Sequence, residues 1–371
     1  MSGDRVAVIW RSCLLPGSET FIRNQGDALT TWRPLYLGAV RVPSPLSRDS
    51  DVVLCPDTPR GRREWLRLRL TGGSPRLRRL LARLRPDVVH AHFGGDGWLV
   101  SRTAAQLGIP LVVTLHGLDV TRQAAAPGPR GTRHRRNLRT VFGRAALILA
   151  VSGAIRDRAV ELGADPAKIR VHHTGVPMPP APATGPKAWD VVFVGRFVEK
   201  KGVEDLVEAL GMLAELRPRV LLVGTGPLHD RVRRRAEQLG VAATFAGALA
   251  PSEVMRHIAE ARILAAPSRT ASDGDTEGLP TTILEAFSLG VPVVSTYHSG
   301  IPEAVSHESN GLLCAEGDRP ALAANLRRLL TDASLRDQLG KAARHRAETD
   351  FDLHHQTRRL ESLYDSLLPR P

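Results

Sequence analysis

The chain has 371 residues, a length that suggests two domains of ordinary size, each with its own core. Its apolar content of 42% is that of a soluble globular protein, and it shows neither the apolar core of a signal peptide nor an apolar segment long enough to cross a bilayer, so we expect a cytoplasmic protein. The net charge of +13 comes almost wholly from arginine in an alanine-rich chain, a bias typical of GC-rich coding sequences, and it is weak evidence for function. Three widely separated cysteines without a CxxC pair argue against a disulfide framework or a structural zinc site.

Short apolar runs alternate with helical patterns through the first half of the chain. Strands are predicted at 5–10, 87–93, 109–117, 145–152 and 168–176, with helices between them. One of these helices is expected to open at Ser18-Glu19-Thr20. The alternation of strand and helix is typical of a parallel sheet covered on both faces.

The stretch from Arg60 to Arg85, RGRREWLRLRLTGGSPRLRRLLARLR, is unusually basic. A solvated helix face accounts for it most simply, and a patch that meets an anionic membrane surface or an acidic partner is the alternative. A nucleic-acid site is disfavoured because Trp65 is its only aromatic residue, whereas single-strand grooves interleave stacking residues with cations.

A proline-rich segment, VPMPPAPATGP at 176–186, marks the predicted boundary between domains spanning 1–175 and 187–350. After it the pattern restarts, with strands predicted at 189–196, 219–226, 243–249, 263–268 and 291–296. Helices are predicted at 203–215 and 280–289, and further helices over the rest of the chain to about 368. The sequence therefore predicts two doubly wound α/β domains, and ligands of such sheets bind at the carboxyl ends of the strands.

Two cations follow the first strand of the second domain, in VVFVGRFVEKKG. Arg196 leaves the strand end beside Gly195, whose missing side chain lets a ligand approach the backbone, and Lys201 precedes the next helix. A diphosphate suits such a pair, although two exposed basic residues would look the same, and the spacing is not that of a P-loop. The glycine-rich turn GTGPL at 224–228 is weaker evidence for a ligand.

The stretch DTEGLPTTILEAFSLG at 275–290 places one carboxylate on each side of a helix start. Pro280 suits the first turn of a helix, and the free N–H groups and positive dipole end there favour an anion. Glu277 lies on the preceding loop and Glu285 inside the helix, so the two carboxylates are placed to bind the sugar hydroxyls on either side of a diphosphate. The alternative is an acid that complements the helix dipole and an ordinary surface glutamate.

These motifs resemble those of family 4 of the retaining glycosyltransferases. EGLPTTILE resembles the E-x7-E motif of that family, and GRFVEKKG resembles its phosphate-binding turn. GSETFI, HAHFG, TLHGLDVT and SDGDTEGLP are similar to a bacterial subgroup that includes colanic-acid, other exopolysaccharide and aminoglycoside glycosyltransferases. The resemblance implies an α/β GT-B fold of two Rossmann-like domains with the active site in the cleft between them. It also implies a nucleoside-diphosphate sugar donor, UDP-sugar favoured over GDP-sugar, and no cofactor or required metal.

The resemblance also implies a role for each matched residue. Arg196 and Lys201 would bind the diphosphate beside Gly195, and Glu285 would hold the ribose. Glu277, His116 and the backbone at Gly278 and Leu279 would contact the donor sugar, with His116 and Glu277 assigned to catalysis. The N-terminal domain would bind the acceptor, and a last helix at 351–371 would pack back on it. Acceptor-side roles are expected for Gly17, Ser18, Glu19, His90, His92 and Asp119.

Several alternatives stay open at this point. Asp273 and Asp275 form a D-x-D pair, which in another glycosyltransferase fold binds a metal, but the neighbouring cationic turn already neutralises phosphate. His90 and His92 share a strand face without a third metal ligand. A nucleotide-sugar epimerase or hydrolase, or a non-catalytic nucleotide-sugar-binding module, would share the fold. The acceptor could be a saccharide, an aminocyclitol or a lipid-linked saccharide reached from the inner membrane face.

Overall fold

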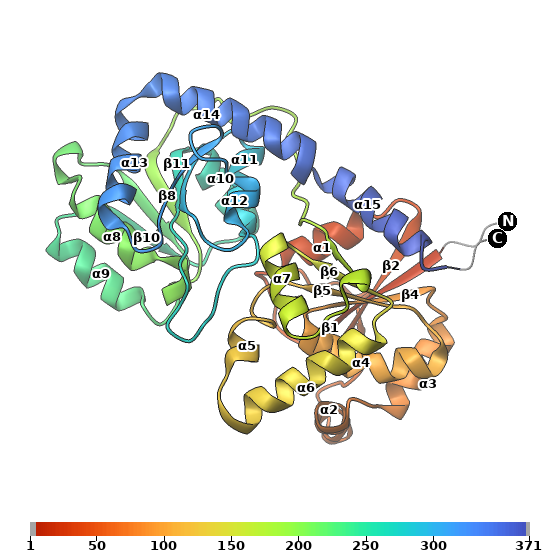
Figure 1. The fold of residues 1–371 in the computed structure, drawn as a ribbon. Coiled ribbons are helices and arrows are strands. Elements are labelled where there is room, and N and C mark those ends of the chain that lie inside the picture. The colour runs from red at the N-terminus through yellow and green to blue at the C-terminus, as the bar shows by residue number, and fades with distance from the viewer. Residues whose placement is uncertain (1–4, 369–371) are drawn as a thin grey trace. The chain divides into compact units, whose positions relative to one another are not determined.

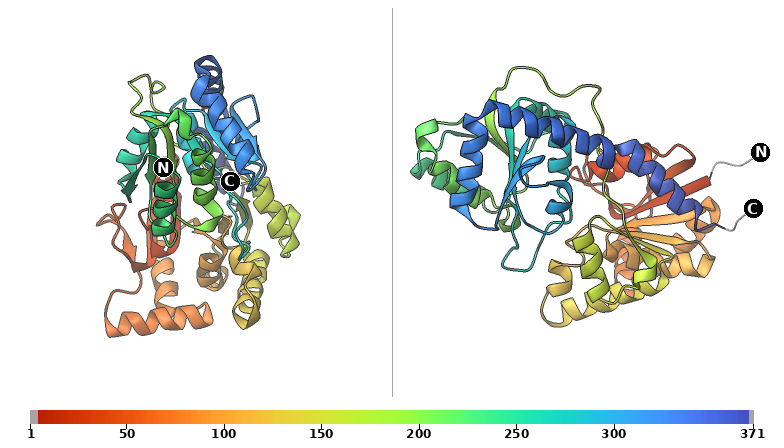
Figure 2. Two further views of the ribbon diagram at one scale, coloured as in Figure 1. Left: turned by 90° about the vertical axis from the view of Figure 1, so that its left-hand side faces the viewer. Right: turned by 45° about the horizontal axis from the view of Figure 1, so that its top comes forward.

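A computed structural model describes residues 5–368 of the chain, which fold into two units (Figure 1). Unit 1 runs to Gly175 and also includes the segment from Leu353 onward, and unit 2 spans Val176–Asp352. Each unit is built on its own parallel sheet with helices on both faces (Figures 1 and 2). Both sheets are parallel because helices or long connections separate their consecutive strands.

The sheet of unit 1 has the strand order β3-β2-β1-β4-β5-β6-β7. Its strands are β1 (Arg5–Leu14), β2 (Trp32–Arg41), β3 (Val52–Val53), β4 (Val88–His92), β5 (Leu111–Leu115), β6 (Leu147–Ala150) and β7 (Ile169–Val171). Alternate residues of β1 enter opposite cores, because side chains along a strand alternate between its faces. Val8 and Trp10 pack into one core, and Ala7 and Ile9 into the other.

The helices of unit 1 are α1 (Thr20–Asp27), α2 (Pro59–Thr71), α3 (Pro75–Leu84), α4 (Gly94–Leu107), α5 (Arg122–Ala125), α6 (Gly128–Arg144), α7 (Gly153–Glu161) and α15 (Leu353–Asp365). The basic run forms α2 and α3, which are separated where Gly72 adopts a left-handed conformation. Most of its arginines are exposed, as are Leu66 and Leu70 on α2. The membrane contact expected for this run stays a prediction, and among residues 5–368 no helix combines the length and apolarity needed to traverse a bilayer.

The sheet of unit 2 has the strand order β10-β9-β8-β11-β12-β13. Its strands are β8 (Trp189–Val194), β9 (Val220–Val223), β10 (Ala243–Gly247), β11 (Ala261–Ala266), β12 (Val293–Thr296) and β13 (Gly311–Cys314). Its helices are α8 (Val203–Gly211), α9 (His229–Gln238), α10 (Pro251–Ala259), α11 (Thr281–Ser288), α12 (Ile301–Ala304), α13 (Arg319–Thr331) and α14 (Ala333–Arg346). Val191 and Phe193 face one core and Val192 the other, so β8 is buried on both sides.

Three expectations from the sequence need correction. The strand β2 lies where none was predicted, because its alternating and charged pattern differs from the continuous apolar runs of the other strands. The strand β13 interrupts the region predicted as helical to the end of the chain. The proline-rich segment packs on unit 2 rather than standing apart: Val176 is buried in its core, and the N–H of Ala183 donates to the carbonyl of Leu289 at 3.0 Å.

The chain crosses between the two units twice. The two crossing segments are hydrogen-bonded to each other within unit 2. The N–H of Val176 donates to the carbonyl of Phe351 at 2.8 Å, and Val176 forms an isolated bridge with Asp352. After Asp352, α15 returns to unit 1, where Tyr364 is fully buried. Residues 369–371 of the predicted last helix lie outside the described residues.

A glycine holds the turn between β8 and α8 against the neighbouring strand end. Gly202 has a φ of 63°, and a Cβ built on it would lie 1.7 Å from the carbonyl oxygen of Pro267. Gly240 has a similar φ of 67° but no atom within 4 Å of such a Cβ. The two glycines therefore share the backbone strain that a side chain would introduce, and only Gly202 adds a steric clash.

We expect Gly240→Ala to lower the free energy of unfolding by about 1 kcal/mol, the cost of a left-handed alanine. Gly202→Ala should cost at least about 2 kcal/mol more, because the clash is with rigid backbone. Denaturant unfolding of both variants, followed by circular dichroism, measures the difference. Equal losses in the two variants would show that the backbone at Pro267 yields freely.

Candidate active site

In each sheet the strand order reverses beside the first strand, and the candidate residues gather at the carboxyl ends of the strands there. In unit 2 the reversal lies between β8 and β11, and in unit 1 between β1 and β4. Loops on opposite sides of such a point diverge over the two faces of the sheet and leave room for a ligand. The residues of each unit form a separate half-site.

In unit 2, a buried carboxylate is held by lysines from the turn after β8. Glu277 is 7% exposed, and its Oε1 lies 2.9 Å from Nζ of Lys201. The neighbouring Lys200 is also buried and donates to Oδ1 of Asp275 at 3.0 Å and to the carbonyl of Thr276 at 3.2 Å. Burial alone would raise the pKa of Glu277, but the ammonium groups of Lys201 and Lys200 hold it below its ordinary value. Glu277 is therefore ionised at neutral pH.

The backbone of Glu277 is fixed by the loop after β12. The N–H of Glu277 donates to Nε2 of His298 at 3.0 Å, and Nδ1 of His298 lies 2.6 Å from Oε1 of Glu316. Because Nε2 accepts from the backbone, Nδ1 carries the proton and donates to Glu316. The hydroxyl of Ser299 donates to the carbonyl of Glu277 at 2.7 Å. Both backbone polar groups of Glu277 are thus satisfied, which holds its backbone in place, and the contact with Lys201 holds its side chain.

The second carboxylate of the motif has a different environment. Glu285 lies within α11, and within residues 5–368 no hydrogen bond to its side chain is found. Burial raises the pKa of Glu285 to about 7, and the charge of Lys201 offsets only part of this effect. A carboxylate with unused oxygens in such a place suits hydroxyl donors from a ligand.

The start of α11 is also suited to bind an anion. Pro280 is the N-cap residue rather than the first helical residue, and no side chain caps this helix. The Oγ1 atom of Thr282 is buried and has no hydrogen-bond partner in the described part of the chain. Unsatisfied donors at a helix N-terminus are a ready binding site for phosphate oxygens.

The turn after β8 leaves one cation unpaired. Arg196 is exposed and forms no ion pair within the described residues. The GTGPL turn packs closely beneath it: the N–H of Phe197 donates to the carbonyl of Thr225 at 2.9 Å, and a Cβ on Gly224 would lie 1.9 Å from the carbonyl oxygen of Gly195. Only glycine allows this approach, so the second glycine-rich turn supports the first.

In unit 1, a pair of histidines lies at the ends of β4 and β5. Nδ1 of His92 is 3.1 Å from Nε2 of His116, and Nε2 of His92 is buried without a hydrogen-bond partner in the described residues. A buried N–H without an acceptor costs more than a bare lone pair, so we assign the His92 proton to Nδ1. Nε2 of His116 is then the acceptor, and its proton lies on Nδ1, where no protein partner is found among residues 5–368. Burial lowers the pKa of His116 to about 3, with the charge of Arg11 acting in the same direction, so the ring is neutral.

Buried carboxylates orient the backbone around these histidines. The carboxylate of Asp119 accepts the N–H groups of Gly94 at 2.8 Å, Gly117 at 3.1 Å and His116 at 3.3 Å. Arg11 pairs with Glu19 and with Asp96, which are both buried. These contacts tie the turn after β1 to the starts of the loops after β4 and β5.

Comparison with known proteins decides the family. The model for Glycosyltransferase Family 4 matches residues 17–178, and the model for Glycosyl transferases group 1 matches residues 179–346. A glycosyltransferase assigned to colanic acid biosynthesis in Escherichia coli K12, WcaL, is 33% identical over 298 residues, covering 76% of this chain and 71% of that protein. This chain is a family 4 glycosyltransferase.

Two further proteins extend the comparison. The amylovoran biosynthesis glycosyltransferase AmsK of Erwinia amylovora is 31% identical to this glycosyltransferase, over 76% of the chain and 70% of AmsK. Among solved structures, Anabaena HepE in complex with UDP and glucose matches with a TM-score of 0.76 at 19% identity, covering 98% of this chain and 100% of that one. The structural match shows that the glycosyltransferase has the expected GT-B fold of two Rossmann-like domains.

Several residues expected on the acceptor side of this glycosyltransferase are buried and hydrogen-bonded within unit 1. His90 is fully buried, with its ring nitrogens 2.6 Å from the hydroxyl of Tyr364 and 2.7 Å from that of Thr114. Asp119 and Glu19 are buried, and their carboxylates are engaged by backbone N–H groups and by Arg11 respectively. The acceptor-side roles expected for these three residues stay a prediction, and the contacts named here show that their side chains are already engaged within unit 1. Gly17 and Ser18 are more accessible, and their roles stay a prediction.

The sequence reasoning also missed residues that build the site. Lys200, His298 and Glu316 were not singled out, although the doubled lysine in EKKG offered a signal for Lys200. Asp275 of the D-x-D pair is bound by Lys200, and its own N–H donates to Asp273. Among residues 5–368 no group of three or more potential metal ligands is found.

The raised pKa of Glu285 predicts that nucleotide-sugar binding depends on pH. Ribose hydroxyls of a bound nucleotide sugar would donate to the ionised carboxylate, so binding would select the deprotonated form and the affinity should rise with pH until it levels off above about 7. Between pH 8 and pH 6 the affinity for UDP-glucose should fall about tenfold. The diphosphate diester of this probe does not ionise in that range. Titration calorimetry of the parent and of Glu285→Gln tests the assignment, since the variant should bind more weakly with a flat pH profile. A parent affinity that is the same at pH 6 and pH 8 would contradict it.

Proposed function

We propose that this glycosyltransferase moves a sugar from a UDP-sugar to a hydroxyl of a saccharide acceptor, with retention of anomeric configuration, in exopolysaccharide synthesis. The observation that carries the proposal is the ionised Glu277, held by Lys201 beside the start of α11. Two relatives of this chain, WcaL and AmsK, are named for colanic acid and amylovoran biosynthesis, and they support a role in polysaccharide synthesis. HepE, solved with UDP and glucose, supports the choice of UDP.

The donor would bind at the half-site of unit 2. Arg196 is an unpaired cation at the strand end, and Lys201 extends its side chain past Gly195, where a Cβ would lie 3.4 Å from its Cδ. Together with the N–H groups at the start of α11, these cations would stabilise the charge that develops on the leaving diphosphate. Glu285 would accept the ribose hydroxyls, and Glu277 those of the transferred sugar.

The half-site of unit 1 would contribute a neutral hydrogen-bond donor. With its Nε2 accepting from His92, His116 presents Nδ1–H. A ring with a pKa near 3 is not a general acid at neutral pH, so its proposed role is to orient a hydroxyl of the donor sugar. His92 is then a positioning residue that fixes the tautomer.

The proposed reaction uses the leaving group as the base. Glu277 is paired with Lys201, which disfavours its attack as a nucleophile in a double displacement. The acceptor hydroxyl would instead attack C1 on the face from which the diphosphate departs. The C1–oxygen bond to the phosphate breaks as the new glycosidic bond forms, and the hydroxyl proton passes to the departing phosphate oxygen. UDP leaves with that proton, and the anomeric configuration is retained.

The two glutamates should fail in different ways when changed to glutamine. Glu285→Gln should weaken the binding of UDP at least tenfold, because ribose binding is common to the ground state and transition state. Glu277→Gln should leave UDP affinity unchanged or tighter, since UDP lacks the sugar and Lys201 loses a competing partner. It should lower turnover at least a hundredfold, because orientation at the reacting carbon acts in the transition state. Calorimetry with UDP and UDP release from the preferred UDP-sugar provide the two measurements.

Arg196→Ala serves as a control for the diphosphate contact and should weaken UDP at least tenfold. Thermal melting checks the fold of each variant. Loss of UDP affinity in Glu277→Gln equal to that in Glu285→Gln would refute the division of roles. Slow release of free sugar without transfer to any acceptor would identify a hydrolase instead.

The cationic phosphate site should make a divalent metal unnecessary. Lys200 already binds Asp275, so a metal would have to displace a buried ion pair to use the D-x-D residues. We expect full turnover in excess EDTA, measured as UDP release with and without added Mn²⁺. Activity that disappears in EDTA and returns with Mn²⁺ would assign the aspartates to a metal after all.

A further inference from the structure

Unit 1 contains a pocket outside the half-site described above. Its volume is about 640 Å³, and it lies at the carboxyl ends of β2 and β3 under the first half of α2. Its lining includes Arg41, Asp51, Val53, Pro56, Arg62 and Trp65. We call it the Trp65 pocket.

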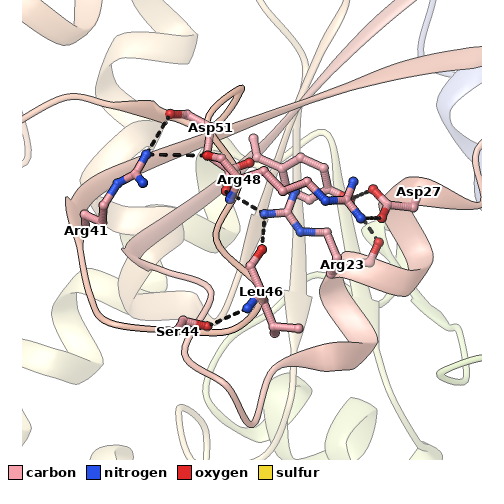
Figure 3. A network of polar contacts seen from close by, with 8 residues as sticks. Arg23, Asp27, Arg41, Ser44, Leu46, Arg48 and Asp51 are labelled. Carbon is pink, nitrogen blue, oxygen red and sulfur yellow. Dashed lines mark hydrogen bonds and ion pairs between the residues drawn. The ribbon is translucent and has the colours of Figure 1, made fainter. Parts of the chain in front are cut away.

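A tethered loop, residues 42–51, contributes Asp51 to the lining of this pocket. Figure 3 shows the polar contacts that hold this loop. Arg23 of α1 donates to the carboxylate of Asp51 at 2.6 Å and to the carbonyl of Leu46 at 2.7 Å. Arg48 pairs with Asp27 of α1 at 2.6 Å. The guanidinium of Arg23 also lies 3.8 Å from the ring centroid of Tyr36. The loop is therefore held by one buried and one more exposed ion pair, and these contacts fix Asp51 in the pocket lining.

The charges lining the Trp65 pocket do not balance. Asp57 pairs with Arg62 at 2.6 Å, and Asp51 pairs with Arg23. Arg41 is exposed and has no carboxylate partner among the described residues. Its NH2 group reaches only the carbonyls of Asp51 at 3.4 Å and Arg48 at 3.5 Å, both long contacts. One unneutralised guanidinium therefore remains at the pocket.

The rest of the lining is largely apolar. The indole of Trp65 is half-buried and packs against the core, and Val53 and Pro56 lie beside it in the lining. Burial raises the pKa of the Cys55 thiol to about 11, so this side chain is neutral and contributes apolar surface. An aromatic ring and a free guanidinium in the lining of one pocket suit a ligand with an apolar ring face and an anionic group.

We propose that the Trp65 pocket binds an acidic sugar residue of the acceptor, with the sugar ring against Trp65 and its anionic group on Arg41. This proposal rests on the proposed function and adds the class of acceptor to it. The same tethered loop reaches the turn after β1, since a Cβ on Gly17 would lie 3.4 Å from Cδ of Pro45. A saccharide in the pocket can therefore continue along the loop toward the end of β1, where the half-site of unit 1 begins.

Three small probes test the pocket on the full chain. Methyl glucuronide, methyl glucoside and glucose 1-phosphate are titrated and followed by saturation-transfer NMR. Methyl glucuronide should bind at least fivefold more tightly than methyl glucoside. Arg41→Gln should remove that preference, and Trp65→Ala should remove saturation of the ring protons for both. Arg63→Gln, an exposed arginine of α2 outside the lining, should behave as the parent.

The outcomes separate the pocket from the donor site. UDP affinity should be the same in the parent and in all three variants. Failure of the parent to bind UDP would contradict the proposed function and leave the pocket proposal standing. Tight binding of glucose 1-phosphate that Arg41→Gln abolishes would support the pocket and indicate a glycosyl phosphate as the acidic group, whereas selective binding of the glucuronide would indicate a uronic acid. Equal binding of glucuronide and glucoside by the parent, or an Arg41→Gln protein that keeps the preference, would overturn the proposal. Arg41 is exposed, so this variant should fold even if Trp65→Ala does not.

Discussion

The ion pair between Glu277 and Lys201, supported by the charge of the neighbouring Lys200, is the interaction on which the site in unit 2 depends. Burial at 7% exposure acts to raise the pKa of this carboxylate, and the neighbouring ammonium groups hold that pKa below its ordinary value. Because Lys200 is itself bound to Asp275, the lysine pair ties two parts of the loop before α11 to one turn. The loop cannot shift without exposing an uncompensated buried charge. The position of α11, and with it that of Glu285, follows from this constraint.

The two glutamates show how surroundings can give the same residue type opposite properties. Glu277 has a lysine partner and a lowered pKa, whereas Glu285 lacks a hydrogen bond in the described residues and has a pKa near 7. The half-site of unit 1 contains three stacked imidazoles, those of His90, His92 and His116. Burial lowers the pKa of each ring and keeps it neutral. One half-site therefore holds fixed charges, and the other holds neutral donors and acceptors whose tautomers are fixed by hydrogen bonds.

Much of this arrangement could be predicted from the sequence, and the limits have physical causes. The buried parallel strands could be predicted from their continuous apolar runs, and the two site glutamates from their motif, because both are local patterns in the sequence. β2 was not, since it pairs with β1 yet carries Arg33, Pro34 and Arg41. The link from His298 to Glu277 joins loops 21 residues apart and leaves no local pattern. The burial of His90, His92 and Asp119 was equally hidden, because a polar residue after a strand looks the same whether it faces a ligand or a backbone N–H.

The route of the chain has a consequence for the order of folding during synthesis. Unit 2 is continuous in sequence, and its first and last residues pair with each other, so it is complete as soon as Asp352 has been made. Unit 1 is begun first, but until the last helix is available its core lacks Leu360 and Tyr364, and His90 lacks one of its two hydrogen-bond partners. Unit 2 therefore needs no segment that follows Asp352, whereas unit 1 cannot close its core without the last helix. The N-terminal unit is the last to close, and a chain truncated before residue 353 would carry one finished unit and one with an open core.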